Sequence, residues 1–229
     1  MMAYQLDSLR VAGIKECTIV VGYLAESVRD YFGSNYKGVR ISYVENTTYD
    51  TSNNLCSLWQ AREAFDDDVL LLESDLVFDD RLICELIKKK EPDVAVVDRF
   101  RPGMDGSVIL ANGGVAKALL LKSEQPQGFD YSSALKTVNI YRLSSETLAG
   151  TILPGMEEFL AKGRTDQYYE AVFASLIRSN RMDMSVMETG KMQWSEIDTL
   201  DDLRETENMI QAVTPAIRMD RPSGTTLIG

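Results

Sequence analysis

Short apolar segments alternate between two spacings along the first hundred residues. Some place apolar side chains on one face of a helix, and others are short aliphatic or β-branched runs typical of buried strands. The predicted helices cover residues 4–12, 24–32, 54–65 and 81–89. The predicted strands cover residues 17–21, 39–44, 69–72 and 94–97. This alternation predicts an α/β domain in which helices cover both faces of a mostly parallel, Rossmann-like sheet.

The pattern changes after Asp98. Two predicted strands, 107–111 and 115–121, flank Asn112-Gly113-Gly114, a sequence typical of hairpin turns, so a small antiparallel β insertion is expected. The remaining predicted elements are a strand at 135–141, helices at 145–161 and 167–179, a strand at 182–187 and a helix at 200–212. The end of the chain has no periodicity. We therefore expect one domain over residues 1–212 and an irregular tail over residues 213–229.

Composition narrows the chemistry. The chain of 229 residues has 35 acidic and 24 basic residues, a net charge of −11, and no basic run that would form a nucleic-acid footprint. It has no histidine, which excludes histidine nucleophile systems, histidine acid–base catalysis and His-ligated metals. Polar chemistry must therefore come from carboxylates, Lys, Arg, hydroxyl groups, backbone amides or a hard metal ion.

Location and cysteine usage point to an ordinary intracellular protein. No apolar run approaches the roughly 20 residues that span a bilayer, and the N-terminus lacks the order of a signal peptide. We predict a cytoplasmic protein with no membrane association. Cys17, Cys56 and Cys84 are odd in number and widely spaced, so we interpret them as buried free thiols rather than as a disulfide framework or a zinc site.

The run VLLLESDLVFDD at residues 69–80 places a carboxylate between two apolar segments. Asp75 follows a strand that should be central and buried, and ligands of open α/β sheets bind beyond the carboxyl ends of strands. A carboxylate there can hold a divalent cation. The alternative is that Asp75 caps the turn into the helix that begins near Asp79.

A second acidic segment favours the cation. In Trp194-Ser195-Glu196-Ile197-Asp198, an extended backbone puts Glu196 and Asp198 on the same face, where they repel unless a positive charge lies between them. The alternative is that Asp198 only helps to cap the helix that follows, a role we assign to Asp201 and Asp202. Mg²⁺ prefers carboxylates, waters and phosphates, so Asp75, Asp198 and Glu196 predict a magnesium site.

A polar cluster precedes the helix at 54–65. Asn53, Asn54 and Ser57 lie at or within its first turn, where amide side chains can read the edge of a heterocycle and free N–H groups face outward. Capping of the helix by Thr51 or Ser52 is the simpler interpretation, but it leaves two adjacent Asn residues unexplained.

Several of these segments occur together in one family. In order, CTIVVGY, NNLCSLW, LLLESDLVFD, KTVNIYRLS, QYYEAVF and WSEIDTLDDL resemble the nucleotidyltransferases of the sugar-phosphate and phosphocholine cytidylyltransferase type, over residues 2–208. The branch that activates phosphocholine, 2-aminoethylphosphonate and related compounds with CTP is the most similar. The resemblance implies a glycosyltransferase-A-like nucleotidyltransferase fold.

The resemblance also implies roles for residues. Asp75 and Asp198 would hold the Mg²⁺ that bridges triphosphate and acceptor, and Lys136 would lie near the phosphates. Asn54 and Ser57, with Asn53, would lie beside the cytosine. The acceptor pocket would contain Tyr169 and Glu170, whose carboxylate could meet an amine or trimethylammonium group, and Asp98 is a weaker candidate for it.

The implied reaction transfers CMP from CTP to a small phosphorylated or phosphonate acceptor and releases pyrophosphate, with catalysis by positioning and charge neutralisation. Members of the family open with a strand and a Gly-x-Gly-x-Arg loop, whereas this sequence begins at the next helix, so we expect an N-terminally truncated domain of the family. The alternatives are a sugar-1-phosphate nucleotidyltransferase that uses another nucleoside triphosphate, or a noncatalytic nucleotide-binding remnant. A homodimer is a further expectation.

Overall fold

The computed structural model describes the backbone of residues 1–217 and the side chains of residues 1–208. The last predicted helix is longer than expected, because α8 covers Leu200–Ile217 and so continues through the first residues assigned to the tail. The rest of the predicted tail, residues 218–229, lies outside the described residues.

The predicted helices and strands occur in the predicted order with shifted ends, and the structure adds short strands at residues 35–36, 76–78 and 194–196. The helices are α1 (Met2–Val11), α2 (Ala25–Phe32), α3 (Asn54–Gln60), α4 (Asp80–Leu86), α5 (Ser145–Thr147), α6 (Leu153–Ala161), α7 (Tyr169–Arg178) and α8. The strands are β1 (Glu16–Val21), β2 (Asn35–Tyr36), β3 (Val39–Glu45), β4 (Val69–Leu72), β5 (Leu76–Phe78), β6 (Val94–Arg99), β7 (Val108–Asn112), β8 (Val115–Leu120), β9 (Ala134–Leu143), β10 (Ser185–Glu188) and β11 (Trp194–Glu196). Among these described helices, none combines the length and the apolar character needed to cross a membrane.

The strands form three sheets, of which only part is parallel. Their orders are β1-β3-β2, β4-β9-β6-β10-β8-β7 and β11-β5, and an added β7–β9 pairing closes part of the large sheet into a barrel-like ring. Among the described residues, the parallel pairs are β1–β3 and β6–β10. The predicted α/β class is correct, but a mostly parallel sheet is only partly confirmed.

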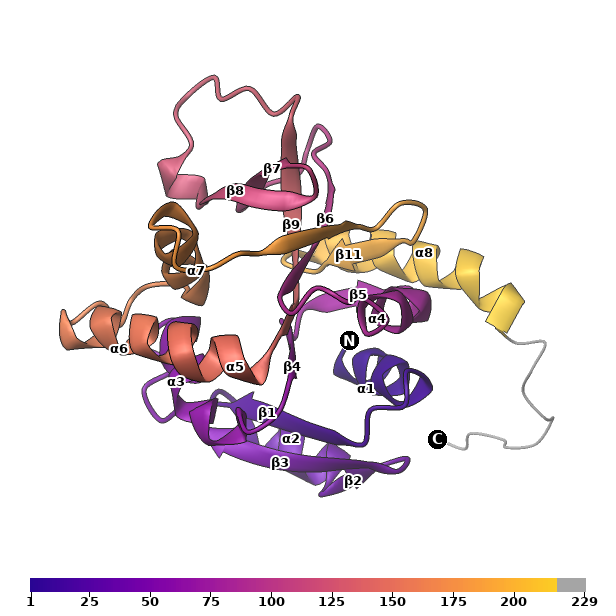
Figure 1. Cartoon of the computed structure of the whole chain (residues 1–229). Coiled ribbons are helices and arrows are strands. Elements are labelled where there is room, and N and C mark those ends of the chain that lie inside the picture. Colours follow the sequence, from indigo (N-terminus) through magenta and orange to yellow (C-terminus); the bar gives the residue numbers. More distant parts are fainter. Residues whose placement is uncertain (218–229) are drawn as a thin grey trace, which may run out of the picture.

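The departure has a topological cause. Alternating helices and strands give a parallel sheet only when each connection crosses over and returns the chain to the same end of the sheet. Here β9, which follows the β7–β8 hairpin in the chain, lies between β4 and β6 and pairs antiparallel with both. In Figure 1, β4, β6 and β9 connect the β1–β3 end of the molecule to the β7–β8 end. The predicted hairpin at Gly113-Gly114 is present between β7 and β8.

Helices cover the central strands from both faces. On β6, Val94 and Val96 join the apolar cluster that contains side chains of α1, α4, β1 and β3, whereas Ala95 and Val97 join the cluster formed with α3, α6 and α7. Since alternate residues of a strand point to opposite faces, one apolar run supplies both cores. Burial on both faces fixes where the ends of β4, β6 and β9 lie.

Candidate active site

The turn between β4 and β5 carries the acidic segment and is held from two sides. From α1, the buried Gln5 side chain donates from Nε2 to the carbonyl oxygens of Glu73 (2.7 Å) and Leu76 (2.9 Å). From the other side, β5 pairs antiparallel with β11, and the amide of Ile197 donates to the carbonyl of Asp75 (3.1 Å). The backbone around Asp75 is therefore fixed by both the first helix and a strand near the end of the domain.

Three carboxylates converge at this turn. Glu73, Asp75 and Glu196 each offer an oxygen, and these oxygens lie within 4.8 Å of one another. All three side chains are half-buried. Oδ1 of Asp75 is buried and has no hydrogen-bond partner among the described residues. An acceptor oxygen buried without a partner is costly unless a donor or a cation meets it.

Glu73 is held by three neutral donors. Its Oε1 accepts from Asn54 Nδ2 (3.0 Å) and from the Tyr169 hydroxyl (3.0 Å), and its Oε2 accepts from Asn139 Nδ2 (3.0 Å). Burial, followed by the charges of Glu170 and Asp75, raises the pKa of Glu73 to about 7. The surrounding hydrogen bonds therefore do not fully compensate for bringing this charge into the protein.

Glu196 connects the cluster to a buried cation. Lys136, which is only 3% exposed, places Nζ 3.4 Å from Glu196 Oε2. Burial raises the pKa of Glu196 and of Asp75, while Lys136 acts in the opposite direction on both. Asp198 is exposed, and its charge adds to the raised pKa of Asp75, so it lies at the solvent side of the same cluster. The structure thus brings the predicted Asp75, Glu196 and Lys136 together.

The three residues predicted to read a base all make hydrogen bonds within the protein. The Asn53 side chain accepts from the amide of Asn54 (2.7 Å), as an N-cap of α3. The Asn54 side chain donates to Glu73 and accepts from the amide of Tyr169 (2.9 Å). Ser57 Oγ accepts from Asn46 Nδ2 (3.0 Å). Asn54 therefore links α3 and α7 to the carboxylate cluster.

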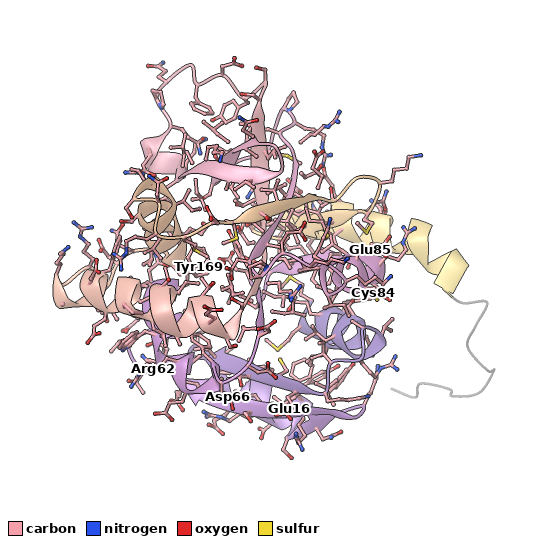
Figure 2. All side chains as sticks on the ribbon, in the orientation of Figure 1. Glu16, Arg62, Asp66, Cys84, Glu85 and Tyr169 are labelled. Carbon is pink, nitrogen blue, oxygen red and sulfur yellow. The ribbon has the colours of Figure 1, made fainter. Side chains whose placement is uncertain are left out.

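The predicted acceptor residues Tyr169 and Glu170 lie beneath the cluster, where Figure 2 shows Tyr169 in the interior of the molecule. Burial raises the pKa of Tyr169 well above its ordinary value, so its hydroxyl keeps the proton that it donates to Glu73. Glu170 is 5% exposed, and its two oxygens accept from the Tyr141 hydroxyl (2.9 Å) and Ser107 Oγ (3.0 Å).

Asp98 lies on β6, outside the cluster of three carboxylates. It is paired with Lys136 in the β6–β9 register, and its Oδ2 accepts from Trp194 Nε1 (2.8 Å) and lies 2.9 Å from the Arg101 guanidinium. Asp98, Arg101 and Trp194 line a hollow of about 340 Å³. Trp194 and Glu196 lie two positions apart on β11 and so share a face, which places this hollow next to the carboxylates.

No known protein-family model matches the chain. The chain is 32% identical over 207 residues to the CMP-5'-(3-aminopropyl)phosphonate synthase of Streptomyces rubellomurinus, in an alignment covering 90% of this chain and 33% of that protein. It is 26% identical over 147 residues to the bifunctional sugar-1-phosphate nucleotidylyltransferase/acetyltransferase of Sulfurisphaera tokodaii, covering 64% of this chain and 33% of that protein. The chain thus spans about a third of the length of these two curated relatives.

The fold is that of a solved cytidylyltransferase. The CTP:phosphocholine cytidylyltransferase of Streptococcus pneumoniae superimposes with a TM-score of 0.70 at 21% identity, over 90% of this chain and 83% of that one. In sequence and in fold, the chain is similar to nucleotidyltransferases of the sugar-phosphate and phosphocholine cytidylyltransferase type. The resemblance inferred from the sequence motifs is therefore confirmed at the level of family.

Three residues of the site were not predicted from the sequence. Glu73 lies in the same VLLLESDLVFDD segment as Asp75, so the prediction of Asp75 as a cation ligand could have been extended to Glu73. Gln5 gave no signal, because its contacts are with residues about seventy positions away. Asn139 gave none either, since it lies inside a segment that reads as an uninterrupted strand.

The residues of the carboxylate cluster fit a hard divalent cation. Carboxylate oxygens are the donors that Mg²⁺ prefers, and the cluster supplies one from each of three residues, of which Asp75 has an oxygen without a hydrogen-bond partner among the described residues. Glu73, Asp75 and Glu196 are the residues that would hold the ion, with Asp198 at the rim.

We predict that Gln5→Leu loosens the turn that carries Asp75. Leucine keeps the apolar packing of α1 but removes the Gln5 donor from the carbonyls of Glu73 and Leu76, so the free energy of unfolding should fall by about 1–3 kcal/mol. Hydrogen exchange of the Asp75 and Leu76 amides should accelerate, as measured by NMR.

Ser8→Ala is the matched control, because Ser8 is buried on the same helix but donates to the Tyr4 carbonyl and to Asp80 instead. It should leave the exchange of the Asp75 and Leu76 amides unchanged. Equal amide exchange rates of Asp75 and Leu76 in the Gln5→Leu and Ser8→Ala variants would contradict the role assigned to Gln5.

Proposed function

We propose that this nucleotidyltransferase transfers CMP from CTP to a small acceptor that carries a phosphonate or phosphate and an amine, and releases pyrophosphate. The proposal is supported most directly by the convergence of Glu73, Asp75 and Glu196 beside the buried Lys136. The relative from Streptomyces rubellomurinus, whose described product joins CMP to an aminopropylphosphonate, supports the base and the acceptor class. A cytoplasmic location and a homodimer remain part of the proposal.

In the proposed reaction, an oxygen of the acceptor phosphonate attacks the α-phosphorus of CTP. A new P–O bond forms there, the bond from the α-phosphorus to the bridging oxygen of the β-phosphate breaks, and pyrophosphate leaves with that electron pair. The acceptor oxygen is already an anion, so no general base is required and the absence of histidine is no obstacle. Mg²⁺ would supply charge neutralisation between the triphosphate and the acceptor.

The chain's own residues then orient the reactants. Asp75 and Asp198, with Glu196 and Glu73, would hold the ion at one edge of the sheet. Lys136 is the buried cation next to that position, where a fixed positive charge stabilises the charge that develops on the phosphates. Asn54 cannot turn freely toward a base without giving up its bonds to Glu73 and Tyr169, so we assign it to holding the site together.

We place the amine of the acceptor in the hollow beside Asp98 and Trp194. An aromatic ring and a buried carboxylate are suitable partners for an ammonium group, and an incoming amine could replace the exposed Arg101 guanidinium at Asp98. Glu170, whose oxygens are both occupied by hydroxyl donors, supports Tyr141 and Ser107 beneath the site.

A second candidate is a sugar-1-phosphate nucleotidyltransferase that uses another nucleoside triphosphate. The relative from Sulfurisphaera tokodaii favours it. A noncatalytic nucleotide-binding protein is a third, and all three differ in what they bind and release.

The proposed activity predicts that the protein releases pyrophosphate from CTP only when Mg²⁺ and an aminoalkylphosphonate or phosphocholine are both present. Assays with CTP, UTP, ATP and dTTP, each with an aminoalkylphosphonate or glucose-1-phosphate, separate the candidates. Turnover only with glucose-1-phosphate would favour the second candidate. Mg²⁺-dependent binding of CTP without release under any condition would favour the third.

Asp75→Asn should lower turnover at least about 100-fold while the protein stays folded, because it removes one charge from the set that holds the cation. Asp201→Asn is the control, since it makes the same change on an exposed residue whose ion pair, within the described part of the chain, is with Arg204 at the start of α8. Initial rates and thermal unfolding of both variants check the prediction. Normal turnover in Asp75→Asn would remove Asp75 from the site.

A further inference from the structure

Asn139 occupies a backbone conformation that ordinary strand residues avoid. Its φ is +58°, in the left-handed region, although it lies in the middle of β9. Asn tolerates this region better than most residues, but at some energetic cost. Strained conformations of this kind persist where the surrounding structure demands them, and they concentrate at functional sites.

A bulge in β9 creates this conformation. Ala95 of β6 pairs with Tyr141, but Val97 pairs with Thr137, so three residues of β9 (138–140) lie opposite the single β6 residue Val96. Bulges redirect side chains and are frequent next to active sites. Here the bulge lies where β4 ends, because the amide of Glu73 donates to the carbonyl of Asn139 (3.3 Å).

The redirected side chain meets two members of the carboxylate cluster. Asn139 Nδ2 donates to Glu73 Oε2 (3.0 Å) and to Glu196 Oε1 (3.2 Å), and it is the donor that joins a carboxylate of the β4–β5 turn to one of β11. The residue is 7% exposed, and its Oδ1 is buried without a partner among the described residues. Packing alone would not favour a buried, half-satisfied amide in a strained conformation.

We propose that Asn139 is a positioning residue of the cation site, which sets the separation of Glu73 and Glu196 so that their oxygens face one ion. This inference rests on the proposed function, because it presumes a divalent cation at the cluster. A neutral amide suits this task, since it can donate to two carboxylates at once and leave their charges for the metal. Groups that orient metal ligands in this way typically contribute 10- to 100-fold to metal affinity.

The test is Mn²⁺ binding to Asn139→Gly, measured by electron paramagnetic resonance titration without nucleotide. Glycine adopts a positive φ without strain, so the bulge is retained while the bridge is removed. The dissociation constant for Mn²⁺ should rise at least tenfold relative to the wild type. Thermal unfolding should remain cooperative.

Asn180→Gly is the matched control. Asn180 also has a positive φ, +53°, but it is exposed after the end of α7, so the substitution relieves the same kind of strain away from the carboxylates. Its Mn²⁺ affinity should equal that of the wild type.

Unchanged or tighter Mn²⁺ binding in Asn139→Gly would overturn the inference. Asn139 would then either have no effect on the cation site or compete with the ion for the carboxylate oxygens. Loss of the folded state in Asn139→Gly would also overturn the inference, because the main role of Asn139 would then be to stabilise the fold. Failure of the wild type itself to bind Mn²⁺ would instead reject the cation site of the proposed function.

Discussion

Repulsion among carboxylates in a half-buried place is the constraint around which this domain is organised. Three carboxylate oxygens lie within 4.8 Å of one another. Two like charges this close destabilise each other, and burial adds to the cost. The protein opposes this with Lys136 near Glu196 and with neutral donors around Glu73. Because the pKa of Glu73 still rises to about 7, the compensation is incomplete, and a divalent cation is the component that would complete it.

The rest of the fold supplies what the cluster needs from distant parts of the chain. Gln5 fixes the β4–β5 turn from α1, and the β5–β11 pairing brings Glu196 beside Asp75. The cores on the two faces of β6 hold these strand ends in place. Figure 1 shows how far apart in sequence the contributors are, from the indigo α1 to the orange β11. Tertiary contacts, rather than one local motif, therefore define the site.

Sequence reasoning could reach those parts of the site that depend on local pattern. Asp75 follows an apolar run, and the alternation around Glu196 and Asp198 puts their carboxylates on one face of an extended segment, so all three were predicted to hold a cation. The antiparallel position of β9 could not be predicted, because strand order depends on long-range pairing that alternation of helices and strands leaves open. The β9 bulge shares this origin, and so does the placement of Asn139. Asn54 and Ser57 were predicted to face a ligand, yet they make contacts within the protein that no spacing rule reveals.

A crystal structure grown with Mn²⁺ and CTP would locate the cation through the anomalous scattering of the metal. We predict one strong peak at about 2.1 Å from an Asp75 carboxylate oxygen, the distance expected for a small divalent ion. Glu196 or Glu73 should lie in the same coordination sphere or one water away. CTP bound with no metal between Glu73, Asp75 and Glu196 would contradict it.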